Sequence, residues 1–146
     1  MTNQEIARTF DKVAFFLSLR DENEFKVGAY ARAAKSIREH PVSIEDMLLA
    51  GEDLTKIEGI GKILAQKVED LVIVGTLKVL EDLLAEFPES LYEMSQIKGI
   101  GPKTILKIFE SHRIRSLDEL RRFLQNGDKL AVPAPYEGRI REFFRR

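Results

Sequence analysis

The sequence predicts an all-α fold built from two small helical subdomains, and three observations lead to this prediction. Apolar residues recur at intervals of three and four, while no stretch alternates apolar and polar residues for long enough to require a β-strand. Capping residues, glycines and prolines divide the chain into segments of helical length. A Gly-Ile-Gly sequence also occurs twice, at an offset of 40 residues, between segments of similar apolar pattern.

The first third of the chain is predicted to form three helices. Thr2 and Glu5 make a capping box that opens the first helix, and Ser43 and Asp46 open a short third one. The second helix carries a row of small residues, which permits close helix–helix approach, and stops before Pro41. The apolar faces of the two long helices comprise Ile6, Phe10, Val13, Phe16 and Leu17 in the first, and Phe25, Ala29, Tyr30, Ala33, Ala34 and Ile37 in the second.

The rest of the chain is predicted as short helices separated by glycine and proline. Each Gly-Ile-Gly sequence breaks the chain, and a helix resumes after it. Ser116 and Glu119 form a further capping box, and Asn126 with Gly127 ends the helix that it opens. The helix after the first Gly-Ile-Gly sequence continues through Leu71 and is closed by Gly75, and the next helix extends from Thr76 to near Pro88. A last helix, over about residues 137–144, is strongly basic.

Composition excludes several kinds of site. The 146 residues contain no Cys and only two His, so a thiolate nucleophile, a Cys-ligated zinc and a His-rich metal site are ruled out. No apolar run approaches the ~20 residues that a membrane-spanning helix needs. The net charge of −1 hides an uneven distribution: −3 over residues 1–54, −3 over 55–90 and +5 over 91–146. The basic last third can therefore meet phosphates.

The repeated segment is the most informative feature. Residues 55–70 read TKIEGIGKILAQKVED and residues 95–110 read SQIKGIGPKTILKIFE. This pattern predicts a helix, a tight Gly-x-Gly hairpin and a second helix, twice. The first glycine permits a positive φ, and the second lets another backbone or a phosphate approach closely. The central isoleucine is expected to pack inward and fix the hairpin. Amide groups at the hairpin and at the next helix N-terminus then form an anion site.

We therefore expect the two segments to hold DNA phosphates. Such contacts address the backbone and not the bases, which predicts sequence-independent binding. Two alternatives remain open from the residues alone: the hairpins merely turn corners between packed helices, or the acidic first 90 residues serve a protein partner. The expected DNA-binding residues are Gly59, Gly61, Lys56 and Lys62 in the first segment, and Gly99, Gly101, Lys103 and Lys107 in the second.

The order of these motifs resembles the N-terminal region of family X DNA polymerases, of the bacterial and archaeal type. The residues that carry the resemblance are NEFKVGAYARAA at 23–34, LTKIEGIG at 54–61, GTL at 75–77, IKGIGP at 97–102 and IRSLDEL at 114–120. It implies a first subdomain at 1–88 with a helix-hairpin-helix motif at 55–70. A second follows at 89–146, with a motif at 95–110 and a degenerate third motif at 130–146. There, Ala134 and Tyr136 stand in the two glycine places.

The resemblance also implies chemistry. No cofactor is required, but backbone carbonyls of each hairpin can hold Na⁺ or K⁺. A Schiff-base lyase acting on abasic sites would use Lys67 as nucleophile, with Lys26 and Tyr30 in support, although Phe25 and Ile63 depart from the family's phosphate pocket. The favoured alternative for Lys67 is a surface lysine of the helix that contacts the DNA backbone or only solvent. The carbonyls that match the cation site are those of Thr55, Ile57 and Ile60, and of Ser95, Ile97 and Ile100.

Polymerisation is not expected of this chain. Two-metal nucleotidyl transfer needs a carboxylate cluster, and no Asp-x-Asp occurs in the sequence. We expect a cytoplasmic, monomeric DNA-binding module that acts on gapped, nicked or duplex DNA. It would be a relative or a part of a longer polymerase chain, and the enzyme class stays open.

Overall fold

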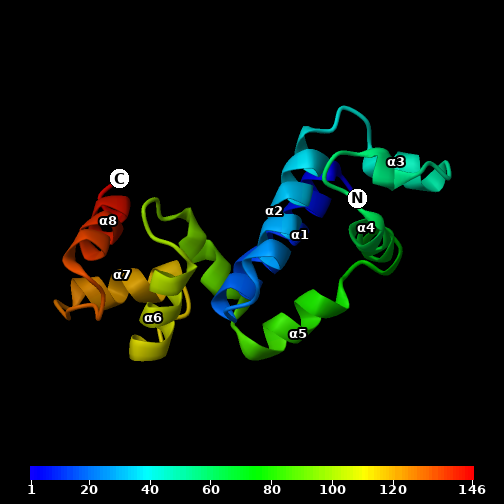
Figure 1. The fold of residues 1–146 in the computed structure, drawn as a ribbon. Coiled ribbons are helices and arrows are strands. Elements are labelled where there is room, and N and C mark those ends of the chain that lie inside the picture. The colour runs from blue at the N-terminus through cyan, green and yellow to red at the C-terminus, as the bar shows by residue number, and fades with distance from the viewer. The chain divides into compact units, whose positions relative to one another are not determined.

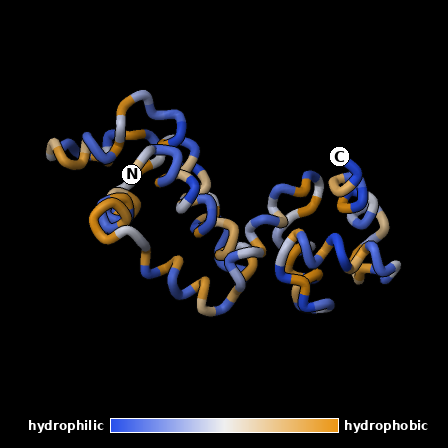
Figure 2. The backbone as a smooth tube through the Cα atoms, turned by 180° about the vertical axis from the view of Figure 1, so that it is seen from behind, coloured by the Kyte–Doolittle hydropathy of each residue, from blue (hydrophilic) through white to orange (hydrophobic).

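The computed structural model describes residues 1–146 and has an all-α fold, as predicted (Figure 1). The chain divides into two compact units, Met1–Ala85 and Glu86–Arg146, each with its own apolar core. No helix is both long enough and apolar enough to cross a membrane. Figure 2 shows hydrophobic and hydrophilic residues interleaved along the helices, as amphipathic packing requires.

Two long helices, α1 (Asn3–Leu19) and α2 (Glu24–Glu39), form the body of the first unit. The Thr2 side chain accepts a hydrogen bond from the Glu5 amide, so the predicted N-terminal cap of α1 is present. Ala33 and Ala34 are completely buried on α2, which is consistent with the close approach expected from small residues. Their packing against the apolar face of α1 gives this unit a rigid frame.

Shorter elements complete the first unit: α3 (Ile44–Leu49), the 3₁₀ turn η1 (Leu54–Lys56), α4 (Lys62–Val74) and α5 (Lys78–Glu86), whose last residue lies beyond the division. The η1 turn packs against both α3 and α4, and α4 also contacts α1. Gly75 ends α4 at φ +93°, in the left-handed region that glycine adopts at little cost. The segment between η1 and α4, which carries the first Gly-Ile-Gly sequence, is thus held at both ends.

The second unit consists of η2 (Glu89–Gln96), α6 (Pro102–His112), α7 (Leu117–Gln125) and α8 (Ala134–Phe144). The η2 turn packs against α6 and α7. The backbone amide of Ala131 donates to Nε2 of His112, whose ring lies 4.5 Å from that of Phe123, so this histidine has a structural role. The core side chains of the unit are Leu91, Met94, Ile97, Ile105, Ile108, Leu120 and Ile140.

Two local expectations are corrected by the structure. The last helix starts at Ala134 and not near residue 137, so Ala134 and Tyr136 lie in regular helix where the third motif would have placed a turn. Neither residue is glycine, and helical backbone is the low-energy choice for both. The central isoleucine of the repeat was expected to pack inward in both copies; Ile60 is buried, but Ile100 is only half-buried.

Candidate nucleic-acid interface

The two Gly-Ile-Gly segments adopt nearly the same backbone conformation, although they lie in separate units. We call residues 57–61 the first hairpin and residues 97–101 the second. Their first glycines have φ of +84° and +89°, and their second glycines have ψ of −176° and −178°. The isoleucines that open them have φ/ψ of −78°/129° and −75°/112°. The sequence repeat is therefore also a structural repeat.

The first glycine of each hairpin is required by the fold. A positive φ is strained for any residue with a side chain. Space is also limited, because a Cβ at Gly59 would lie 3.2 Å from Oγ of Ser36 and 3.8 Å from the carbonyl oxygen of Arg32. A Cβ at Gly99 would overlap Cδ of Arg139 on α8. Both turns are thus held against another element of their own unit.

The second glycine of each hairpin is not required by the fold. Gly61 and Gly101 have φ of −86° and −110°, a conformation open to any residue. No atom lies within 4 Å of the place where a Cβ would stand on either one, and both are exposed. The missing side chain therefore leaves open surface next to the backbone, which suits close approach by a group from outside the chain.

The helices that follow the hairpins begin without side-chain caps. Gly61 and Gly101 are the N-cap residues of α4 and α6, so no side chain satisfies the first amide groups of these helices. Neither helix has an acidic residue in its first turn. By contrast, Thr2, Asn23, Ser43 and Ser116 each cap their helix with a side-chain oxygen. The N-termini of α4 and α6 are thus free to meet an anion.

Lysines surround both open N-termini. The side chains of Lys56, Lys62, Lys103 and Lys107 are exposed, and no acidic side chain forms an ion pair with them. The structure thus places seven of the eight predicted DNA-binding residues at or beside the hairpins, while Lys107 lies in the second turn of α6. Sequence reasoning missed Lys98, which directly precedes Gly99 and is also exposed. Its counterpart in the first hairpin is acidic, so the repeat comparison drew no attention to it.

The residues expected for lyase chemistry are spread over different environments. Lys67 is half-buried on α4 without an ion pair, and Lys26 is exposed in the first turn of α2. Tyr30 is only 3% exposed, packs edge-on against Phe10, and its burial raises its pKa to about 12. Its hydroxyl is thus protonated at neutral pH and belongs to the core. Phe25, which departs from the family's phosphate pocket, is 83% exposed.

The carbonyls expected to hold a cation belong to the turns themselves. Ile57 ends η1, and its carbonyl accepts the Ile60 amide at 3.0 Å. The Thr55 hydroxyl donates to Asp53 at 2.6 Å, which holds the pKa of that carboxyl below its usual range, and the Ser95 hydroxyl donates to the Tyr92 carbonyl at 2.6 Å. Both hydroxyls thus donate to the preceding turn, and neither donates to the backbone carbonyl of its own residue.

Comparison with known proteins agrees with this geometry. Residues 1–77 match the family described as "Helix-hairpin-helix domain", and residues 91–131 match "SAM-like Helix-hairpin-helix tandem". The chain is similar to DNA polymerase/3'-5' exonuclease PolX of Bacillus subtilis, with 27% identity over 121 residues, or 83% of this chain and 20% of that protein. It is also similar to DNA polymerase lambda of Arabidopsis thaliana, with 28% identity over 122 residues, or 82% and 22%.

These findings confirm the resemblance to family X DNA polymerases over most of the chain. The chain spans about a fifth of the length of these curated relatives.

The different demands on the two glycines of one hairpin can be measured. We expect Gly99→Ala to lower the free energy of unfolding by about 1–3 kcal/mol, because it forces a side chain into a positive φ against Arg139. Gly101→Ala should change it by less than about 1 kcal/mol, because its backbone is extended and its surroundings are open. Urea unfolding monitored by circular dichroism provides both values, and equal losses would contradict the assignment.

Proposed function

Because this chain belongs to the helix-hairpin-helix domain family, we propose that it binds the DNA backbone through its two hairpins without reading base sequence. The observation that carries this proposal is the second glycine of each hairpin, which neither backbone strain nor internal packing explains. The same open surface occurs twice, each time at an uncapped helix N-terminus. A phosphate is an anion that such a site accommodates.

The chemistry of the hairpins favours phosphate over base recognition. Backbone amides and lysine ammonium groups donate to phosphate oxygens but carry no pattern that distinguishes one base pair from another. Neither hairpin contains Arg, Asn or Gln, since its own residues are isoleucine, glycine and one charged residue, Glu58 or Lys98. Affinity should therefore depend on salt and on DNA geometry more than on base sequence.

The two units should contribute unequally. The first unit has 11 basic and 15 acidic side chains, net −4, while the second has 12 basic and 9 acidic side chains, net +3. Repulsion from the acidic body opposes the first hairpin, while the second unit attracts the polyanion over a Debye length of about 10 Å at moderate salt. We thus expect the second hairpin to supply the larger part of the affinity.

The relation to family X polymerases suggests which process this DNA binding serves. We propose that the module positions gapped, nicked or duplex DNA as a part or a relative of a longer repair polymerase. No Asp-x-Asp occurs in the chain, so nucleotide addition is not proposed for it.

The proposed interface is tested by the double variant Gly61→Val and Gly101→Val. Both positions tolerate a side chain in the folded protein, so the variant should stay helical and fail to bind, with at least a tenfold loss of affinity for a short duplex in fluorescence anisotropy at low salt. The matched control is Ala85→Val, which places the same side chain at an exposed helical position outside both hairpins. Undiminished binding by a folded double variant would refute the proposal.

We also propose that the hairpin carbonyls of residues 55, 57 and 60, and of 95, 97 and 100, hold Na⁺ or K⁺ beside a DNA phosphate. Carbonyl oxygens suit such cations, and the Ile57 oxygen keeps a lone pair beyond its bond to Ile60. Replacing K⁺ with tetramethylammonium at equal ionic strength should weaken duplex binding several-fold, since that ion is too large to be coordinated. Equal affinity in both salts would show that no such cation is needed.

A second candidate function is a Schiff-base lyase that uses Lys67. One observation favours it: Lys67 is half-buried on α4 and has no carboxylate partner. We expect borohydride to trap a covalent adduct with an incised abasic duplex, and Lys67→Ala to abolish it. Lys107→Ala, at the same place in the second repeat, should leave trapping unchanged. An adduct that survives Lys67→Ala would remove this residue from the chemistry.

A further inference from the structure

We propose that Arg139, carried by α8, is a phosphate-binding residue of the second hairpin, so that the third motif has become a support for the second. This inference rests on the proposed DNA binding and assigns a contact to a segment whose own hairpin is absent. The sequence predicts this segment as a degenerate repeat with a strongly basic helix, and the structure places that helix against the Gly99 turn.

The contact between α8 and the second hairpin is direct. Nη1 of Arg139 donates to the Gly99 carbonyl oxygen at 2.6 Å. The aliphatic part of the same side chain covers Cα of Gly99, since a Cβ there would come within 3.2 Å of Cγ and closer still to Cδ. Arg139 thus occupies the space where a side chain at residue 99 would lie. The Gly99 carbonyl in turn positions the Arg139 guanidinium.

The ring of Tyr136 also contacts the Arg139 guanidinium. Cζ of Arg139 lies 5.2 Å from the centre of this ring, within the range of a cation–π contact. Tyr136 and Arg139 are three residues apart on α8 and therefore share a face. The tyrosine that replaces the second glycine of the lost hairpin consequently has a new role, which is to orient an arginine.

The charge of Arg139 is not neutralised within the unit. Its one hydrogen bond goes to a neutral carbonyl, which leaves four of its five N–H donors and its full charge for a ligand. The acidic residue nearest along the helix face, Glu142, pairs instead with Arg145 at 3.6 Å. Lys98, next to Gly99, is also unpaired and exposed, so two cations flank the same turn.

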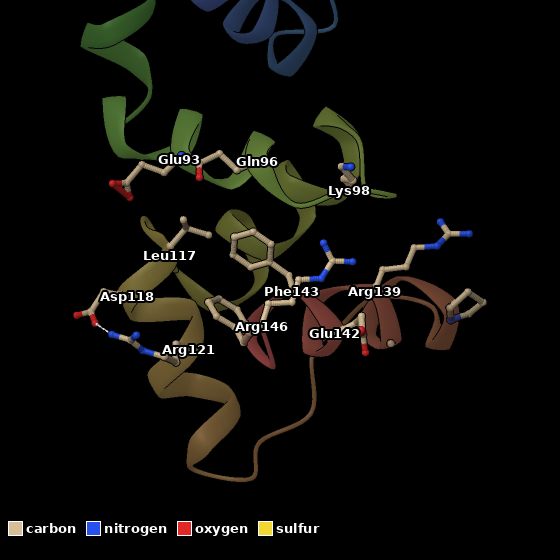
Figure 3. Close-up of a pocket in the computed structure, with 13 residues that line it drawn as sticks. Glu93, Gln96, Lys98, Leu117, Asp118, Arg121, Arg139, Glu142, Phe143 and Arg146 are labelled. Carbon is tan, nitrogen blue, oxygen red and sulfur yellow. Dashed lines mark hydrogen bonds and ion pairs between the residues drawn. The ribbon is translucent and has the colours of Figure 1, made fainter.

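A groove of about 970 Å³ in the second unit has these two cations among its lining residues. Figure 3 shows Lys98 and Arg139 toward one end of the groove, and Glu93 and Asp118 toward the other. Asp118 is bound by Arg121 and Arg122 at 2.6 and 2.7 Å. The basic end adjoins the second hairpin, and a backbone phosphate at this turn would meet Lys98, Arg139 and the free amides of α6 together.

The test compares Arg139→Gln with Arg139→Lys by the salt dependence of duplex binding. Glutamine keeps an amide donor for the Gly99 carbonyl but removes the charge, while lysine keeps the charge. We expect Arg139→Gln to weaken binding roughly three- to thirtyfold at low salt and to reduce the slope of log K against log salt by about 0.9, the value for one phosphate contact. Arg139→Lys should retain the slope.

The control is Arg141→Gln, on the same helix but not lining the groove and paired with Glu137, which should change the slope by much less. An unchanged slope in a folded Arg139→Gln variant would overturn the inference, because a residue that only braces the turn alters affinity without altering the number of phosphates neutralised. If the unaltered chain bound no duplex at low salt, the proposed function itself would fail.

Discussion

The left-handed backbone at Gly59 and Gly99 is the constraint on which the rest of the site depends. With φ near +85°, each of these glycines turns the chain tightly. Two residues later an extended glycine, Gly61 or Gly101, precedes the next helix. A side chain at either turn would cost about 1–3 kcal/mol. The N-cap residues that follow, Gly61 and Gly101, have no side chain, so the first amides of α4 and α6 remain uncapped and available to an anion.

One backbone geometry is supported in two different ways. The first hairpin lies against α2, where Ser36 and the Arg32 carbonyl are the nearest atoms to Gly59. The second lies under a long basic side chain from α8. A polar helix surface braces the turn in an acidic unit, and a guanidinium braces it in a basic one. The local support therefore reinforces the difference in net charge between the units, and the two hairpins are alike in shape but not in electrostatic environment.

Most of the fold could be predicted from the sequence, because the signals are local. The side-chain caps at Thr2, Ser43 and Ser116, and the glycine turns, depend on residues a few positions apart, and each is present as predicted. The start of α8 was placed too late because the region was aligned to a hairpin it does not form. The contact of Arg139 with the Gly99 carbonyl could not be read from the sequence either, because it joins residues 40 positions apart.

The site itself was only partly accessible to sequence reasoning, for the same physical reason. The glycines, the flanking lysines and the repeat could be read directly, since they follow one another along the chain. The edge-on contact of Tyr30 with Phe10 could not, because it depends on how α1 meets α2. Tyr30 lies in the core, as its place on an apolar face predicted, and its burial raises its pKa.

Each compact unit carries one hairpin on a core of its own, so the proposed DNA binding would be bivalent. Once one unit has bound, the other meets the same DNA at a local concentration set by the short connection between them, which is in the millimolar range for short linkers. Two weak contacts can then give a long-lived complex, while each contact alone exchanges rapidly. Such a chain could shift along a duplex by releasing one hairpin at a time without leaving it.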